Sequence, residues 1–207
     1  MMEIYEDLEQ GTDEWRACRA GIPTASCFRN ILAKGQGKTR ASYMRRLAAE
    51  IITGEPLENF TTPAMERGHL LEDEARSLYA FTHDVEPKQV GFIRNGRKGC
   101  SPDSLLDSAG LLEIKTQRGD LLIETILKDE FPSTFVAQVQ GQLWIAEREY
   151  CDLLVYSPGL PPFVKRAYRN EPYIAQLADA VAAFNDELSL LVEKIKKYGG
   201  ISEPKAA

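Results

Sequence analysis

Apolar residues recur at helical spacing along much of the chain. Phe28, Ile31 and Leu32, for example, fall on one face of a helix that is predicted to begin near Thr24. Further helices are predicted over residues 42–53, 63–81, 133–147 and 172–198. The helix over 63–81 has the strongest start signal, because Thr62 at the cap precedes Pro63 at the first helical position.

The period of the pattern changes between residues 85 and 117. Short β-rich runs are separated there by Asn-Gly and Ala-Gly turns, which predicts an antiparallel meander. Two more strands are predicted in residues 150–157 and 163–169. This order of elements predicts an α/β (α+β) fold with a central mixed β-sheet flanked by helices. We expect a single domain over residues 1–207, with a short acidic N-terminal segment (1–14) and a C-terminal helix (about 172–198).

Composition narrows the function classes. No apolar run is long enough for a membrane span, and the N-terminus lacks the features of a secretory signal, so we expect a cytoplasmic protein without a membrane partner. The four cysteines are scattered, which disfavours a zinc site, an iron–sulfur cluster or a disulfide scaffold. With only two histidines, carboxylates must do most of the proton or metal chemistry.

Charge is distributed unevenly. The net charge of −6 disfavours a nucleic-acid partner at first sight. Residues 15–49, however, contain eight basic residues and no Asp or Glu: Arg16, Arg19, Arg29, Lys34, Lys38, Arg40, Arg45 and Arg46. This segment could form a positive face for DNA, or a solvated surface balanced by acidic neighbours in space.

Candidate chemistry lies in "CSPDSLLDSAGLLEIKTQ", residues 100–117. A hairpin with its turn at "DSAG" can bring Asp103 and Glu113 side by side, and Lys115 shares the face of Glu113 because side chains alternate along a strand. Two carboxylates and a backbone carbonyl suit Mg²⁺ or Mn²⁺, and a neighbouring lysine could orient or activate a water. The alternative is a surface salt bridge of Lys115, but charges inside the apolar run "LLEIK" need a reason.

Two helices offer further polar side chains. Glu72 is adjacent to the buried-face position Leu71 and could reach toward the sheet edge, or it could be solvated. Gln138 and Gln142 form an i, i+4 pair, and such glutamines are usually surface residues unless they position a water or a phosphate.

Five motifs occur in an order that resembles one family. "GIPTAS", "GHLLEDEA", "CSPD", "LEIK" and "AQVQGQLW" are similar to the motifs of the phage lambda exonuclease / YqaJ-type viral recombinase family, within the PD-(D/E)xK nuclease superfamily. The similarity extends from Trp15 to the strands near residue 165. It implies a restriction-endonuclease-like domain and a homotrimer.

The resemblance implies a role for each matching residue. Asp103, Glu113 and the backbone carbonyl of Ile114 would bind Mg²⁺ or Mn²⁺, and Lys115 would act on the attacking water. Glu72 and Gln138 would complete the catalytic group. The other implied roles are 5′-phosphate binding by Arg19, Thr24, Ser26 and Ser101, and strand separation by Met65. A helix starting at Thr24–Ser26 would also present N–H groups to a phosphate, although plain capping by Thr24 and a solvated Arg19 is the alternative.

The function expected from these features is a Mg²⁺-dependent exonuclease that degrades the 5′-ended strand of linear duplex DNA. It would release mononucleotides and leave a 3′ overhang for a single-strand annealing protein in recombination. One alternative is an endonuclease of the restriction or repair type, which would cut circular DNA. Another is a non-catalytic module that binds DNA ends.

Overall fold

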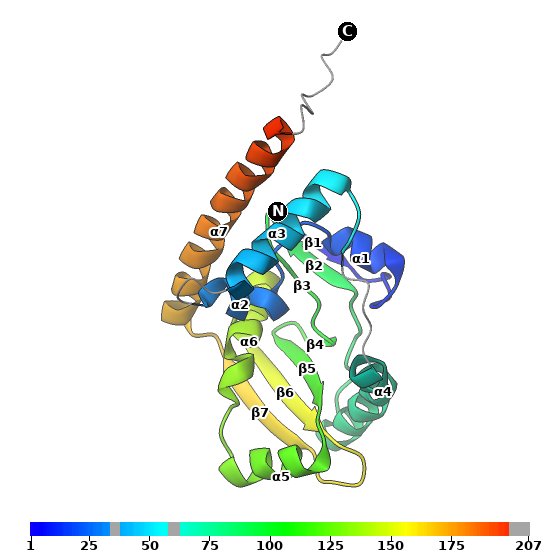
Figure 1. Ribbon diagram of the computed structural model, residues 1–207. Helices are drawn as coiled ribbons and strands as arrows, with labels where there is room; N and C mark the ends of the chain where they lie inside the picture. The colour runs from blue at the N-terminus through cyan, green and yellow to red at the C-terminus, as the bar shows by residue number, and fades with distance from the viewer. Residues whose placement is uncertain (34–37, 58–62, 199–207) are drawn as a thin grey trace.

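The computed structural model describes residues 1–33, 38–57 and 63–198, with backbone positions only at 63–67 and 69. In these described residues, seven strands form two sheets (Figure 1). The first is antiparallel and has the order β1 (Met2–Tyr5), β2 (Phe92–Asn95), β3 (Gly99–Cys100). The second has the order β4 (Ser104–Leu106), β5 (Gly110–Thr116), β6 (Tyr150–Tyr156), β7 (Phe163–Tyr168). Its central pair β5–β6 is parallel and its outer pairs are antiparallel, so the mixed sheet is confirmed.

The predicted meander over 85–117 is divided between the two sheets. Strands β2 and β3 belong to the first sheet and β4 and β5 to the second, with Ser101, Pro102 and Asp103 between them. Proline has no N–H to donate to a strand ladder, so pairing is interrupted at this point. The interruption matters because it brings Asp103 to the start of β4, beside the strand that carries Glu113.

The predicted helices form close to their expected bounds. They are α3 (Lys38–Thr53), α4 (Pro63–His83), α6 (Ser133–Ala146) and α7 (Glu171–Tyr198). The pattern did not predict β1, α1 (Asp13–Arg19) or α5 (Gly119–Lys128). The helix predicted from Thr24 is instead a 3₁₀ turn (Ala25–Cys27) followed by the five-residue α2 (Phe28–Leu32). No helix in the described ranges is both long and apolar enough to cross a membrane.

Helices cover both faces of the second sheet. In Figure 1, α6 lies on one side of β5 and α4 on the other. Leu112 and Ile114 of β5 pack in a cluster with Ala75 and Tyr79 of α4. Because side chains alternate along a strand, Glu113 and Lys115 point to the other face, toward α6. The site is therefore built on the α6 side of the sheet.

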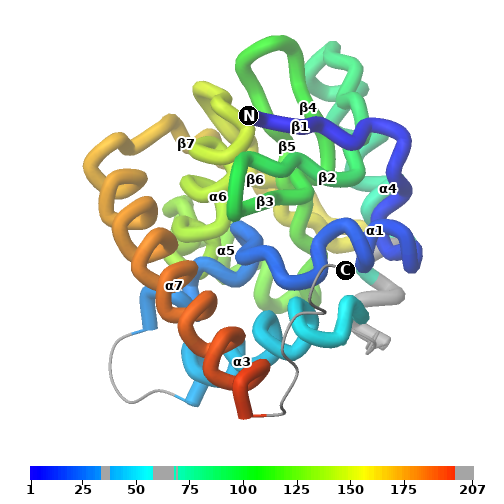
Figure 2. Tube along the Cα trace, turned by 90° about the horizontal axis from the view of Figure 1, so that it is seen from above, coloured from blue at the N-terminus to red at the C-terminus, as the bar shows by residue number. Residues whose placement is uncertain are grey.

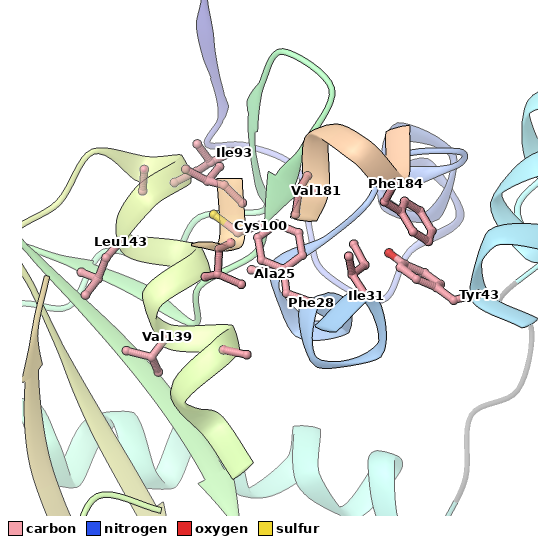
Figure 3. Close-up of a cluster of buried hydrophobic side chains, with 14 of the residues drawn as sticks. Ala25, Phe28, Ile31, Tyr43, Ile93, Cys100, Val139, Leu143, Val181 and Phe184 are labelled. Carbon is pink, nitrogen blue, oxygen red and sulfur yellow. The ribbon is translucent and has the colours of Figure 1, made fainter. Parts of the chain in front are cut away.

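The main core joins α6 to the N-terminal elements. Figure 3 shows Val139 and Leu143 of α6 in the same cluster as Phe28 and Ile31, with Phe184 of α7 next to Tyr43. The close approach requires Gly141, because a Cβ there would lie 2.6 Å from Cδ2 of Phe28. Tight packing at this glycine brings the 3₁₀ turn, and Ser26 on it, close to the glutamines of α6.

Helices α3 and α7 lie side by side (Figures 1 and 2). Arg40 of α3 donates two hydrogen bonds to the Glu187 carboxylate of α7, at 2.7 and 2.9 Å. Arg16 and Arg46 are likewise within ion-pair distance of Asp13 and Glu50. Part of the basic segment 15–49 is thus balanced by acidic neighbours, which was one of its two interpretations.

Candidate active site

The β4–β5 hairpin holds the first carboxylate pair. Ser104 is opposite Leu112 in the ladder, so Asp103 and Glu113 continue the same register. Oδ2 of Asp103 accepts a hydrogen bond from the backbone N–H of Ile114 at 2.5 Å, which fixes the Asp103 side chain against β5. The turn is stabilised by Asp107, whose Oδ1 accepts from the amides of Ala109 (2.6 Å) and Gly110 (2.9 Å).

Glu113 is almost fully buried, with 2% of its surface exposed. Nζ of Lys115 is 2.6 Å from its Oε1, and Nε2 of Gln138 donates to the same oxygen. Nε2 of Gln142 donates to Oε2 at 2.5 Å. Lys115 therefore pairs with the buried carboxylate of Glu113. The alternative interpretation, a salt bridge of Lys115 on the protein surface, is excluded.

Electrostatics in the site follow from burial and crowding. Burial and the nearby Glu113 carboxylate raise the pKa of Asp103 well above its usual range, against the opposing effect of Lys115. Burial favours a neutral Lys115, but Glu113, Asp103 and Glu72 outweigh it and raise the pKa of Lys115. Lys115 is thus an ammonium group at neutral pH. Such a cation can orient a water or stabilise negative charge on a phosphate.

Glu72 approaches the site from the opposite face of the sheet. It lies on α4 and borders, together with Asp103, a groove of about 340 Å³. Gly68, one turn earlier, faces Thr116 of β5, since a Cβ there would lie 3.4 Å from Oγ1 of Thr116. Glu72 is half-buried and lines the same groove as Asp103, as expected for a side chain that reaches toward the sheet edge.

A cavity of about 160 Å³ opens beside the carboxylates. It is lined by Arg19, Ser26, Ser101, Asp103, Glu113, Lys115, Gln138 and Gln142, together with Gln10, Trp15 and Ala25. The guanidinium carbon of Arg19 is 3.7 Å from the centre of the Trp15 ring. Nε1 of Trp15 donates to Oγ of Ser101 at 3.1 Å and to the carbonyl of Gly91 at 2.9 Å. Three of the four predicted phosphate ligands are thereby brought together.

Thr24 is the fourth, and it does not line this cavity. Its side chain is buried, its backbone N–H donates to the Tyr43 hydroxyl, and its own hydroxyl is 3.3 Å from that of Ser26. The helix expected to begin here is replaced by a 3₁₀ turn and a five-residue helix, and phosphate binding at this turn stays a prediction. The Thr24 hydroxyl thus lies next to Ser26, which lines the cavity, without lining the cavity itself.

The turn that follows Arg19, the last residue of α1, is held by a second buried carboxylate. Oε2 of Glu50 on α3 accepts from the backbone N–H of Gly21 at 2.8 Å, and Oε1 accepts from Leu57 at 3.2 Å. Gly21 has φ +72°, a conformation that glycine adopts without strain. The turn after Arg19 is therefore fixed to α3.

For two predicted site residues, Met65 and Ile114, the structure does not place the side chain in the site. Met65 lies on α4, but its side chain is outside the described residues. Ile114 has its side chain buried on the α4 face, so only its backbone adjoins Asp103.

The donor set fits a hard divalent cation. Asp103 and Glu113 supply carboxylate oxygens at one point of the hairpin. Within the described part of the chain, no group of three or more His, Cys, Asp and Glu side chains could hold a metal ion. Mg²⁺ is often bound in proteins by one or two carboxylates and several waters, so two carboxylates with a backbone oxygen match its preference.

Sequence reasoning missed three residues that touch the site. Nε2 of Gln10 donates to the carbonyls of Val90 (2.8 Å) and Pro102 (3.1 Å), and thus ties the N-terminal segment to the residue before Asp103. Trp15 and Gln142 are the others. The polar cluster "EQGTDEW" has no periodicity that would mark Gln10 or Trp15. The spacing of Gln142 left a surface position and a role in positioning a ligand both open, and the side chain is only 1% exposed.

A comparison with solved structures indicates the class of protein to which this chain belongs. The chain is similar to the crystal structure of an alkaline exonuclease from Laribacter hongkongensis, with a TM-score of 0.84, 32% identity, and coverage of 91% of this chain and 98% of that one. The same exonuclease in complex with dAMP matches equally well. A phage-related exonuclease from Haemophilus somnus 129PT has a TM-score of 0.66 at 16% identity, covering 84% of this chain and 96% of that one, and shows the fold alone. Fold and likeness together define a nuclease.

The family follows from a separate comparison. The model of the YqaJ-like viral recombinase domain matches residues 14–149. The chain belongs to the YqaJ-like viral recombinase family, as its motifs predicted. No protein with a curated description matches it.

Proposed function

We propose that the protein is a Mg²⁺-dependent exonuclease that degrades the 5′-ended strand of linear double-stranded DNA. One observation carries this proposal: the buried Glu113, 2.6 Å from Lys115, shares a cavity with Asp103 and with Arg19, Ser26 and Ser101. Carboxylates for a cation and groups for a phosphate thus line the same small space. The dAMP complex of the Laribacter exonuclease supports it, because dAMP is a nucleotide of the kind that such an enzyme would release.

Each residue of the site would have a separate role in phosphodiester hydrolysis. Asp103 and Glu113, with the carbonyl of Ile114, would hold Mg²⁺ or Mn²⁺, which when bound lowers the pKa of water and offsets phosphate charge. Lys115 would orient the attacking water and stabilise charge on the phosphate oxygens, and Gln138 would keep Glu113 in place. The water oxygen bonds to phosphorus, the bond from phosphorus to O3′ of the terminal nucleotide breaks, and O3′ takes up a proton.

Binding of the 5′-phosphate at the DNA end would explain why degradation proceeds from the 5′ end. The cleaved phosphate stays on the next nucleotide as a new 5′-phosphate, and Arg19, Ser26 and Ser101 would bind it. An arginine can hold a phosphate through two hydrogen bonds. The remaining strand would be left as a 3′ overhang for a single-strand annealing protein. From the family we also propose a homotrimer, a cytoplasmic location, and strand separation by Met65.

A three-substrate assay tests the proposal. Linear duplexes with 5′-phosphate and 5′-hydroxyl ends, and a closed circle, are incubated with the protein in Mg²⁺. We expect mononucleotide release that is faster from the phosphorylated end, and an intact circle. Cutting of the circle would favour the endonuclease alternative. Equal rates on both linear substrates would contradict the Arg19 pocket, and no release in Mg²⁺ or Mn²⁺ would favour a non-catalytic DNA-end-binding module.

A further inference from the structure

Gln142 donates a hydrogen bond to the Glu113 carboxylate, whereas the family resemblance gave a role only to Gln138 on the same helix. It follows Gln138 by four residues on α6, so both side chains point to the same face of the sheet. Gln138 donates to Oε1 of Glu113, and Gln142 donates to Oε2. The two amides thus grip the two oxygens of one buried carboxylate.

The hydrogen bonds to Glu113 leave one acceptor position of its carboxylate unoccupied. A carboxylate has about four acceptor positions, two on each oxygen. Oε1 uses both, for Lys115 and Gln138. Oε2 accepts from Gln142 and from no other described group. The remaining acceptor position on Oε2 is the one available to a cation, and the Gln142 bond determines its orientation.

The carbonyl oxygen of the Gln142 side chain makes burial of this amide unfavourable, so the hydrogen bond that its N–H group donates to Glu113 needs an explanation. Oε1 of Gln142 is buried and has no hydrogen-bond partner among the described residues. An amide oxygen in that state costs free energy that an apolar side chain of similar length would not. The amide cannot simply be reversed, because its oxygen would then face the acceptor-only carboxylate of Glu113.

From these contacts we infer that Gln142 is a positioning residue that orients Oε2 of Glu113 for a divalent cation. The inference rests on the proposed function, since Glu113 is the proposed cation ligand. Groups that orient a metal ligand commonly change metal affinity by about 10–100-fold.

The chain offers a matched control in Gln140. It lies on the same helix and is 6% exposed, against 1% for Gln142. Its Nε2 donates to the carbonyl of Tyr168 and its Oε1 accepts from Asn170, both at 2.8 Å. Gln140→Met therefore removes a buried amide that makes two hydrogen bonds but has no contact with Glu113.

Calorimetric titration of the full chain with Mg²⁺, in the absence of DNA, tests the inference. We expect Gln142→Met to weaken Mg²⁺ binding about tenfold and Gln140→Met to leave the Kd within twofold of the unmutated protein. In the nuclease assay, Gln142→Met should need more Mg²⁺ for half-maximal rate yet approach the normal rate at saturation. Gln142→Leu serves as a second apolar variant if the methionine variant does not fold.

The outcomes separate this inference from the proposed function. If the unmutated protein binds Mg²⁺ and both Gln142 variants bind it equally well, the inference is wrong and the proposed function stands. A loss of affinity of the same size in Gln140→Met would also overturn it, because the effect would then come from any buried amide of α6. If the unmutated protein binds no divalent cation, the proposed function and the inference fail together.

Discussion

The central sheet carries two buried carboxylates on neighbouring strands and opposite faces. Glu113 on β5 faces α6, whereas Asp152 on β6 faces α4, and each is 2% exposed. Asp152 accepts two hydrogen bonds from Arg166, at 2.7 and 2.8 Å, and one from the Tyr79 hydroxyl at 2.5 Å. Glu113 also accepts three, from Lys115, Gln138 and Gln142.

The difference lies in what surrounds each group. Glu113 borders a cavity that also contains Asp103 and Arg19. Asp152 is enclosed by the ring of Tyr79, a strand partner and the sheet itself, and its hydrogen bonds fasten α4 to β6 and β7. Burial of a charge is therefore no evidence of catalysis. An open acceptor position beside a cavity, with a second carboxylate nearby, is the feature that separates the two sites.

The largest effect on stability is expected at Asp152. Asp152→Ala leaves Arg166 and the Tyr79 hydroxyl without their partner. Because the Arg166 side chain is 43% exposed and can be solvated, we expect a cost of about 2 kcal/mol. Urea denaturation measures this as a fall in the free energy of unfolding. Glu124→Ala, which removes the exposed ion pair with Lys128, should change that free energy by less than about 0.5 kcal/mol. Equal effects of the two substitutions would mean that Asp152 does not hold α4.

The largest effect on catalysis is expected on the α6 face of the second sheet, at Lys115. Lys115→Ala removes the cation beside Glu113, and we expect the rate of nucleotide release to fall about 10²–10³-fold while DNA-end binding is retained. Lys165→Ala, on β7, loses only its contacts to Asp129 and should keep the rate. An unchanged rate in Lys115→Ala would contradict the assigned role of this lysine.

A smaller effect is expected at the hairpin turn, and it depends on pH. The amide of Ala109, the Tyr150 hydroxyl and the amide of Gly110 hold the pKa of Asp107 below its ordinary value of 3.8. A lowered pKa in the folded state stabilises the protein above the ordinary value, and this contribution is lost as the pH falls through the folded value.

Asp107→Asn should therefore lower the free energy of unfolding at pH 7 by about 1 kcal/mol or less, since the carboxylate is exposed. The gap between variant and unmutated protein should narrow as the pH is lowered through 3.8. Urea denaturation at several pH values measures the gap. A gap that widens in acid would mean that the charge of Asp107 does not stabilise the turn.

Local patterns were enough to predict the parts of the fold and site that lie close together in sequence. Alternation along β5 and the "DSAG" turn brought Asp103, Glu113 and Lys115 together. Pro63 at the first helical position gave the start of α4, whereas the predicted cap Thr62 lies outside the described residues. Contacts between distant segments could not be predicted in this way. β1 pairs with β2 nearly 90 residues later, and its two middle residues, Glu3 and Ile4, are exposed without alternation.

Polar residues at such long-range contacts carry no periodic signal. Gln142 looked like a surface glutamine because its partner, Glu113, lies 29 residues earlier on another element. Thr24 was expected in the phosphate pocket, but the 3₁₀ turn directs Ser26, not Thr24, to the cavity. In both cases contacts between segments far apart in the sequence, such as the packing of Gly141 against Phe28 and Ala25, are absent from the local pattern.

The comparison of the two carboxylates yields the most direct test of the account. Glu113→Gln and Asp152→Asn each replace a buried carboxylate by an amide of the same shape, and both variants are assayed for nucleotide release from a 5′-phosphorylated linear duplex in Mg²⁺, at a temperature where both are folded. The account predicts that Glu113→Gln loses at least about 10²-fold in rate, whereas Asp152→Asn keeps a rate within a few-fold of the unmutated protein. A Glu113→Gln variant as active as Asp152→Asn would contradict the assignment of the active site.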